Sequence, residues 1–153
     1  MSEASTNQFD WPVRVYYEDT DGGGVVYHAN YLKFMERART EWLRSLGFEQ
    51  TELRNEMGIL FVVRALRLKY RLPAYFNDEL LVTTKINKAG YSLLEFAQAI
   101  QRNDGQHTAQ LTQAVVEVVC VDAEQFKPVS MPLPIRNAIK IRNANNTMEP
   151  AWN

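Results

Sequence analysis

Several features of secreted, membrane and nucleic-acid-binding proteins are missing from this 153-residue sequence. Its single cysteine, Cys120, cannot form a disulfide within the chain. The longest plainly apolar run, Ile59 to Val63, is far shorter than the roughly 20 residues that a membrane-spanning helix needs. The formal net charge of -1 gives no electrostatic reason to expect nucleic acid as a partner. The first ten residues lack the basic and then apolar pattern of a signal peptide. These absences favour a reducing, cytoplasmic setting.

What is present is the composition of a globular protein. Hydrophobic residues make up 46% of the chain and charged residues 23%, which is typical of a chain that folds around a core. The length suits one domain, and the sequence has neither internal repeats nor a linker that would divide it. We therefore expect a single domain over residues 1–153, with loose tails at 1–10 and 143–153.

The first half of the sequence predicts one strand and one long helix. Val13 to Glu18 is rich in Val and Tyr and favours a strand. The helix is expected from about Asn30 to Gly47, a residue type that commonly ends helices in the left-handed conformation. Its apolar residues recur at spacings of three or four and form one stripe: Tyr31, Phe34, Met35, Ala38, Trp42 and Leu46.

The second half changes to a period of two, which predicts strands. After an irregular stretch at 48–58, alternating patterns cover residues 66–72, 80–87, 94–100 and about 108–121. Turn residues at 88–91 and an Asp-Gly pair within 103–106 indicate short hairpin connections. One strand, one long helix and four strands joined in this way predict an α+β fold, in which a mainly antiparallel sheet packs against the helix.

The residues with the most chemical potential lie at 17–31, between the first strand and the helix. This segment holds two aspartates, Asp19 and Asp21, three consecutive glycines and one of the two histidines, His28. Glycines let a ligand approach the backbone, and the start of a helix offers unpaired N–H groups that can bind an oxyanion. A nearby carboxylate can act as a base or a nucleophile.

Simpler interpretations of the same segment stay open on local grounds. An Asp-x-Asp before glycines is often a solvated turn, and a histidine near a helix start often caps or packs. A metal site at Asp19, Asp21 and His28 has no further ligand spacing to support it. The glycines are not a phosphate-binding P-loop, because no Lys-Ser or Lys-Thr follows them.

The segment resembles the 4-hydroxybenzoyl-CoA thioesterase branch of the hotdog superfamily, and in particular the bacterial acyl-CoA thioesterases associated with the Tol–Pal system. The matching stretches are Val13 to Asp21, Gly24 to His28, Tyr31, and Glu36 to Glu41. Similarity continues to Val119-Cys120-Val121-Asp122 and Lys127-Pro128, over about nine-tenths of the chain. Gly22 stands where close relatives are expected to have Ala, which loosens the loop slightly.

The resemblance implies a hotdog fold, in which about five strands wrap one long helix, and a catalytic role for Asp21. In the family this carboxylate is either a nucleophile on the thioester carbonyl or a general base for water. Tyr17 is expected to position groups in the site, and His28 to orient Asp21 or the substrate. The backbone N–H at about residue 28, on the first helical turn, is the candidate for polarising the carbonyl. Asp19 is assigned a structural role in the loop.

The function implied is hydrolysis of short-chain or aromatic acyl-CoA, with no cofactor and no metal. Hotdog proteins also pair their sheets into dimers and tetramers, with sites at subunit boundaries. An alternative is a protein that binds acyl carrier protein or a cell-envelope partner and hydrolyses only incidentally. A hotdog dehydratase is disfavoured, because the His and Glu arrangement of those enzymes is missing from the central helix.

Further site components are expected only by residue type. The acyl pocket is expected to use Tyr27, Tyr31 and residues around Phe61. Six cations near the strands are available for the coenzyme A phosphates, but their alternation is typical of a solvated face: Arg64, Arg67, Lys69, Arg71, Lys85 and Lys88. Cys120, in a Val-rich strand, is expected to be a buried small hydrophobe.

Overall fold

The computed structural model describes residues 8–103, 105 and 107–143. Its strands are β1 (Phe9–Arg14), β2 (Ile59–Tyr70), β3 (Glu79–Ala89), β4 (Leu93–Asn103) and β5 (Thr108–Asp122). Its helices are α1 (Asn30–Ser45), α2 (Gln50–Glu52) and α3 (Leu133–Asn143). A 3₁₀ turn (Tyr17–Asp19) precedes α1, and a π-helical turn (Leu53–Met57) follows α2. None of the helices in the described ranges is long and apolar enough to cross a membrane.

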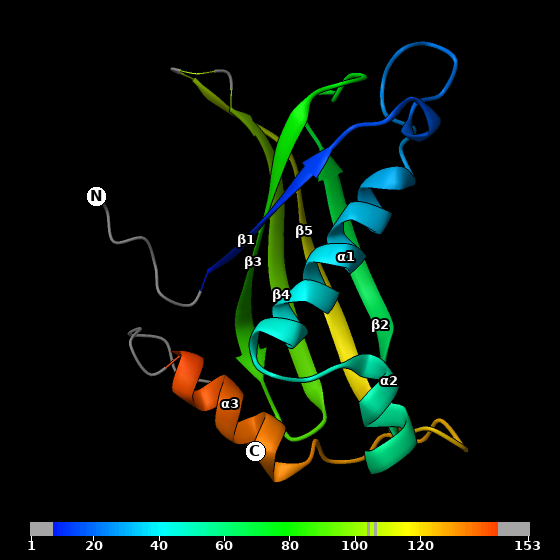
Figure 1. Cartoon of the computed structure of the whole chain (residues 1–153), viewed down its shortest axis with the longest axis vertical. Helices are drawn as coiled ribbons and strands as arrows, with labels where there is room; N and C mark the ends of the chain where they lie inside the picture. Colours follow the sequence, from blue (N-terminus) through cyan, green and yellow to red (C-terminus); the bar gives the residue numbers. More distant parts are fainter. Residues whose placement is uncertain (1–7, 104, 106, 144–153) are drawn as a thin grey trace.

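The five strands form one antiparallel sheet in the order β1-β3-β4-β5-β2. The sheet curves around α1, which crosses one face of it (Figure 1). The predicted α+β architecture, one long helix wrapped by a curved antiparallel sheet, is confirmed. The predicted end of α1 is also confirmed, because Gly47 has a φ of 99° just after the helix.

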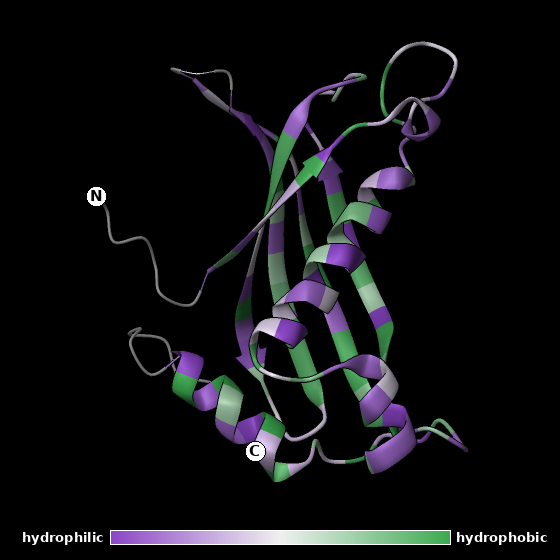
Figure 2. Ribbon diagram, viewed as in Figure 1, coloured by the Kyte–Doolittle hydropathy of each residue, from purple (hydrophilic) through white to green (hydrophobic). Residues whose placement is uncertain are grey.

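The core lies between α1 and the sheet. Phe34, Met35 and Ala38 of the predicted helical stripe are fully buried. Apolar and polar residues alternate along the strands (Figure 2). On β4 the predicted inward-facing residues Leu94 and Ile100 are at most 1% exposed. Local periodicity therefore predicted correctly which side of each central element is buried.

The first strand differs from its prediction at both ends. β1 begins at Phe9 and ends at Arg14, so the expected loose tail at 1–10 is wrong for its last residues, while 1–7 lie outside the described residues. Phe9 and Trp11 are partly buried against the core and pair with β3. The strand does not reach Glu18, because the Asp19 carboxylate accepts the Tyr16 N–H and stabilises a 3₁₀ turn there.

The helix α3 was not predicted. Ile135 and Ile139 are buried at a spacing of four, and Asn143, expected to open a loose tail, is the buried last residue of α3. The rest of the expected tail lies outside the described residues. The second strand is also longer than expected, since β2 begins at Ile59, next to the π-helical turn.

Candidate active site

The predicted site segment is a loop between the 3₁₀ turn and α1, at the end of the sheet away from α3 (Figure 1). Thr20 and Val26 form an isolated antiparallel bridge, and the Asp21 N–H donates to the Val25 carbonyl over 2.9 Å. The glycines form the tip of this small hairpin. Gly24 has a φ of 89°, a conformation that side-chain-bearing residues rarely adopt. Gly24 therefore makes the tight reversal possible.

Asp21 lies at the exposed surface of this loop. Its carboxylate accepts the N–H of Gly23 over 2.7 Å, a contact that holds the side chain over the glycine tip. Within the described residues it has no hydrogen bond or ion pair to His28 or Tyr17. One carboxylate oxygen, Oδ1, is thus held by the loop backbone, and the other oxygen stays available to a ligand.

Tyr17 and His28 line two separate hollows beside the loop. The Tyr17 ring meets Phe76 edge-on, with centroids 5.9 Å apart, at a hollow of about 430 Å³ that the glycine loop also lines. The His28 ring contacts Tyr27 at 4.5 Å and faces a hollow of about 280 Å³ that Tyr31 also lines. The structure thus places the three predicted site residues around one loop without direct contacts between their side chains.

Asp19, in contrast, is buried and fully engaged. It is 6% exposed, and its carboxylate accepts the Asn30 amide N–H over 2.7 Å and the Tyr16 N–H over 2.8 Å. Its carbonyl accepts the Tyr27 N–H over 2.9 Å. The structural role predicted for Asp19 agrees with these contacts.

Asn30, the buried partner of Asp19, was missed as a site-building residue. It is 8% exposed and starts α1, and the helical pattern of the sequence marks it only as a helix boundary. Its side chain does not cap the helix but reaches back to the carboxylate. The sequence signal for this role is only a polar residue at the start of a helix, before an apolar stripe. That signal does not identify Asp19 as the partner of Asn30.

Two N–H groups at the entrance to α1 are unpartnered. His28 lies just before the N-cap residue Ala29, so the expectation that His28 belongs to the first helical turn is wrong by about two residues. In the part of the chain that the structure describes, neither the His28 N–H nor the Ala29 N–H has an acceptor. Unpaired N–H groups at a helix start can stabilise an oxyanion.

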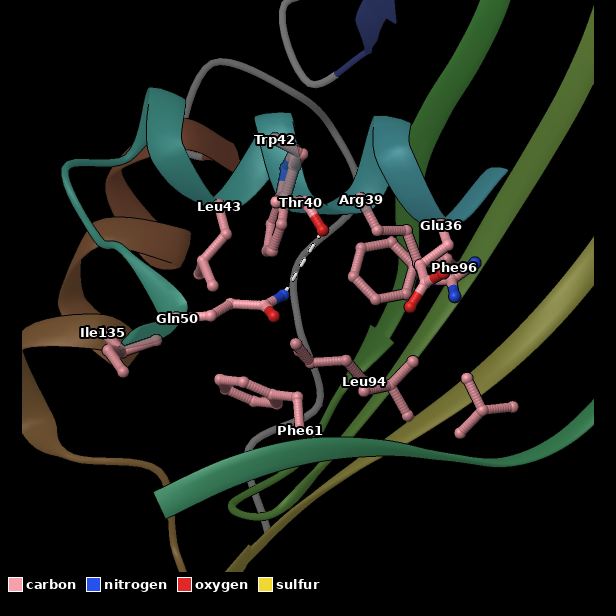
Figure 3. Close-up of a pocket in the computed structure, with 12 residues that line it drawn as sticks. Glu36, Arg39, Thr40, Trp42, Leu43, Gln50, Phe61, Leu94, Phe96 and Ile135 are labelled. Atoms are coloured by element: carbon pink, nitrogen blue, oxygen red, sulfur yellow. Dashed lines mark hydrogen bonds between the residues drawn. The ribbon is translucent and has the colours of Figure 1, made fainter. Parts of the chain in front are cut away.

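A separate cavity of about 150 Å³ lies between α1 and the sheet (Figure 3). Phe61 and Phe96 contribute apolar walls, and Arg39 lies at its polar side. The Arg39 guanidinium donates to the buried Gln98 over 3.0 Å, and burial lowers the pKa of Arg39. Phe61, near which the acyl pocket is expected, lines this cavity. Tyr27 and Tyr31 do not line this cavity; Tyr31 belongs to the core.

The remaining candidates lie away from the loop, except that Arg71, one of the six expected cations, lines the same hollow as His28. Arg67 and Lys69 pair with residues on the face of β5 opposite to α1, and Lys85 lines the same shallow outer hollow. Cys120 is fully buried, and burial raises the pKa of its thiol to about 11, so the protonated form dominates at neutral pH. Among the described residues no group of His, Cys, Asp and Glu is placed to hold a metal ion.

Residues 23–109 match the family model described as the thioesterase superfamily, a stretch that covers the loop from Gly23 onward, α1 and the strands β2, β3 and β4. The chain belongs to the thioesterase superfamily. This thioesterase is 47% identical, over 132 residues, to the acyl-CoA thioesterase YbgC of Haemophilus influenzae. The match covers 86% of this chain and 94% of that relative.

Solved structures of thioesterases superpose on most of the chain. A probable thioesterase from Bartonella henselae is 36% identical with a TM-score of 0.76, covering 82% of this chain and 99% of that one. A 1,4-dihydroxy-2-naphthoyl-CoA thioesterase from Synechocystis is 26% identical with a TM-score of 0.78, covering 86% and 95%. The hotdog fold implied by the resemblance is therefore confirmed for this thioesterase.

Proposed function

We propose that this thioesterase hydrolyses acyl-CoA to a free acid and coenzyme A, with a short-chain or aromatic acyl group. The observation that carries the proposal is the loop at 20–29, where an exposed Asp21 carboxylate precedes two unpartnered N–H groups at the start of α1. The similarity to an acyl-CoA thioesterase over nearly the whole of both chains supports coenzyme A as the leaving group.

The proposed mechanism assigns one task to each group of the loop. The N–H groups of His28 and Ala29 polarise the thioester carbonyl and stabilise the negative charge that develops on its oxygen. Asp21 either attacks the carbonyl carbon and forms an anhydride, which water then opens, or removes a proton from the attacking water. In both cases the C–S bond breaks and the thiolate leaves as coenzyme A. Tyr17 and His28 orient the substrate from the two hollows.

Hydrolysis by the wild-type protein tests this proposal. Thiol release is measured with a panel of acyl-CoA thioesters of increasing chain length, together with benzoyl-CoA and the acyl carrier protein thioester of the best acyl group. We expect turnover of one short-chain or aromatic class. If the protein prefers the carrier protein thioester, the acyl carrier protein and not coenzyme A is the carrier of its substrate. A protein inactive on every thioester would overturn the proposed function.

We further propose that the working form is a homodimer or a homotetramer built through the β2 edge. β2 is the last strand of the sheet order, so one side of its backbone has no strand partner within the described residues. Its side chains on the α1 face include Leu66 and Tyr70, which are 40% and 49% exposed. An exposed edge with apolar residues favours pairing with another chain. A second copy would also shield the exposed loop from water.

The assembly is measured by light scattering coupled to size exclusion. We expect a molar mass of two or four chains for the wild type, and a smaller mass together with lost hydrolysis for Leu66→Lys, because a charge on the pairing edge opposes association. Leu133→Lys on α3, an equally simple change of an exposed leucine, is the control and is expected to keep mass and activity. A monomeric wild type with full activity would contradict the proposed assembly.

The proposed setting is the cytoplasm, where acyl-CoA is available. The free, buried thiol of Cys120 agrees with a reducing compartment, in which cysteines stay unpaired. The resemblance to the Tol–Pal-associated branch supports a link between this hydrolysis and cell-envelope proteins. Fractionation of cells that express the tagged chain tests the location.

A further inference from the structure

Tyr70, the last residue of β2, contacts the loop from a distant part of the chain. Its hydroxyl donates to the His28 carbonyl over 2.6 Å, across 42 positions of sequence. Its ring lies edge-on to the His28 ring, with centroids 6.5 Å apart, and packs against Tyr31 at 5.5 Å. β2 is thereby joined to the residues that precede α1.

The accepting carbonyl is one that the helix leaves unused. In a regular helix the Leu32 N–H would donate to the His28 carbonyl. Here it donates to the Ala29 carbonyl over 3.2 Å. Among the described residues, the Tyr70 hydroxyl is therefore the hydrogen-bond donor to the His28 carbonyl. Tyr70 is 49% exposed in the single chain, where water can replace its hydroxyl as a donor, so the contact contributes little to the stability of the individual chain.

The hydrogen bond from Tyr70 affects the Ala29 N–H because the peptide group is planar. The His28 carbonyl and the Ala29 N–H belong to the same rigid unit and point in opposite directions. A donor that fixes the carbonyl also fixes the direction of the Ala29 N–H, which has no acceptor of its own among the described residues. Water in place of the hydroxyl satisfies the carbonyl without imposing that direction.

The Tyr70 ring is held in place independently of its hydroxyl. It packs between His28 and Tyr31, and the buried Tyr31 hydroxyl accepts the Ala74 N–H over 3.0 Å, just beyond the end of β2. Phenylalanine at position 70 can keep these ring contacts. The hydroxyl is thus a separable element whose removal changes one hydrogen bond.

We propose that Tyr70 is a positioning residue, whose hydroxyl orients the 28–29 peptide so that the Ala29 N–H faces the thioester oxygen. This inference rests on the proposed function and adds a residue from β2 to the site. It assigns Tyr70 an effect on the chemical step, where the oxygen becomes charged, and little effect on the binding of acyl-CoA.

The first test observes the peptide directly and needs no turnover. The chain contains two histidines, and only His28 is followed by alanine, so labelling with carbonyl-¹³C histidine and ¹⁵N alanine yields a single carbonyl–amide NMR signal. We expect this signal to shift or broaden in Tyr70→Phe and to stay in place in Tyr91→Phe. Tyr91 has a similar exposure, 44%, and lies in the turn between β3 and β4. An unmoved signal in Tyr70→Phe overturns the inference.

The second test is steady-state hydrolysis of the best acyl-CoA. Tyr70→Phe is expected to lower kcat about tenfold with KM changed less than about twofold and an unchanged unfolding midpoint, while Tyr91→Phe keeps wild-type values. The tenfold loss should persist in a His28→Ala background, because the alanine keeps the backbone carbonyl. A loss that vanishes there, or that appears in KM alone, overturns the positioning role. An inactive wild type overturns the proposed function, and the NMR signal then still decides whether Tyr70 holds the peptide.

Discussion

Asp21→Asn is expected to lower kcat for the preferred acyl-CoA by at least about a hundredfold, roughly 2.7 kcal/mol of transition-state stabilisation. Asparagine has the shape of aspartate and retains an oxygen that accepts the Gly23 N–H, so the loop should keep its conformation. What is lost is the negative charge, and with it the nucleophile or base. The measurement is thiol release at saturating substrate, with the unfolding midpoint checked in parallel.

Glu18→Gln provides the matched control, because it neutralises another exposed carboxylate, which lies in the 3₁₀ turn three residues before Asp21. It is expected to retain wild-type turnover. Equal activity of Asp21→Asn and the wild type would exclude the Asp21 mechanism. A comparable loss in Glu18→Gln would indicate that the charge of the whole loop matters, and not one carboxylate.

Asp19→Ala is expected to lower the free energy of unfolding by about 3 kcal/mol, because a buried carboxylate with two hydrogen bonds is removed and the Asn30 amide is left without its acceptor. Turnover should fall as well, since Asp19 connects the 3₁₀ turn, the loop and the start of α1. Urea denaturation measures the stability, with Asp10→Ala on β1 as an exposed control that should change it little.

Removing the partner tests whether the effect comes from this contact. Asn30→Ala and the Asp19→Ala, Asn30→Ala double variant complete a double-mutant cycle, and we expect the losses to be clearly non-additive because the two side chains share a hydrogen bond. Additive losses, or a loss below about 1 kcal/mol for Asp19→Ala, would show that the loop does not depend on the contact.

The elements with strong local patterns were predicted best. The α1 stripe and the alternation in β3, β4 and β5 reflect burial against one side, which repeats along the element and can be recognised without the partner. β1 and α3 were misplaced or missed. Three alternating side chains in β1 and two buried isoleucines in α3 are too few for a periodic signal, and their burial depends on the neighbours that cover them.

By itself, the sequence determined the α+β class, the order of the five strands and the long helix, and a glycine loop that places carboxylates before that helix. Only the tertiary structure decided which aspartate is buried and which is exposed, since both precede the same glycines. It also decided that Asn30 binds Asp19 and that Tyr70 reaches the His28 carbonyl. These contacts join residues 11 and 42 positions apart. The physical reason is that local patterns record whether a side chain is buried, whereas the identity of its partner depends on how β2, the loop and α1 pack together.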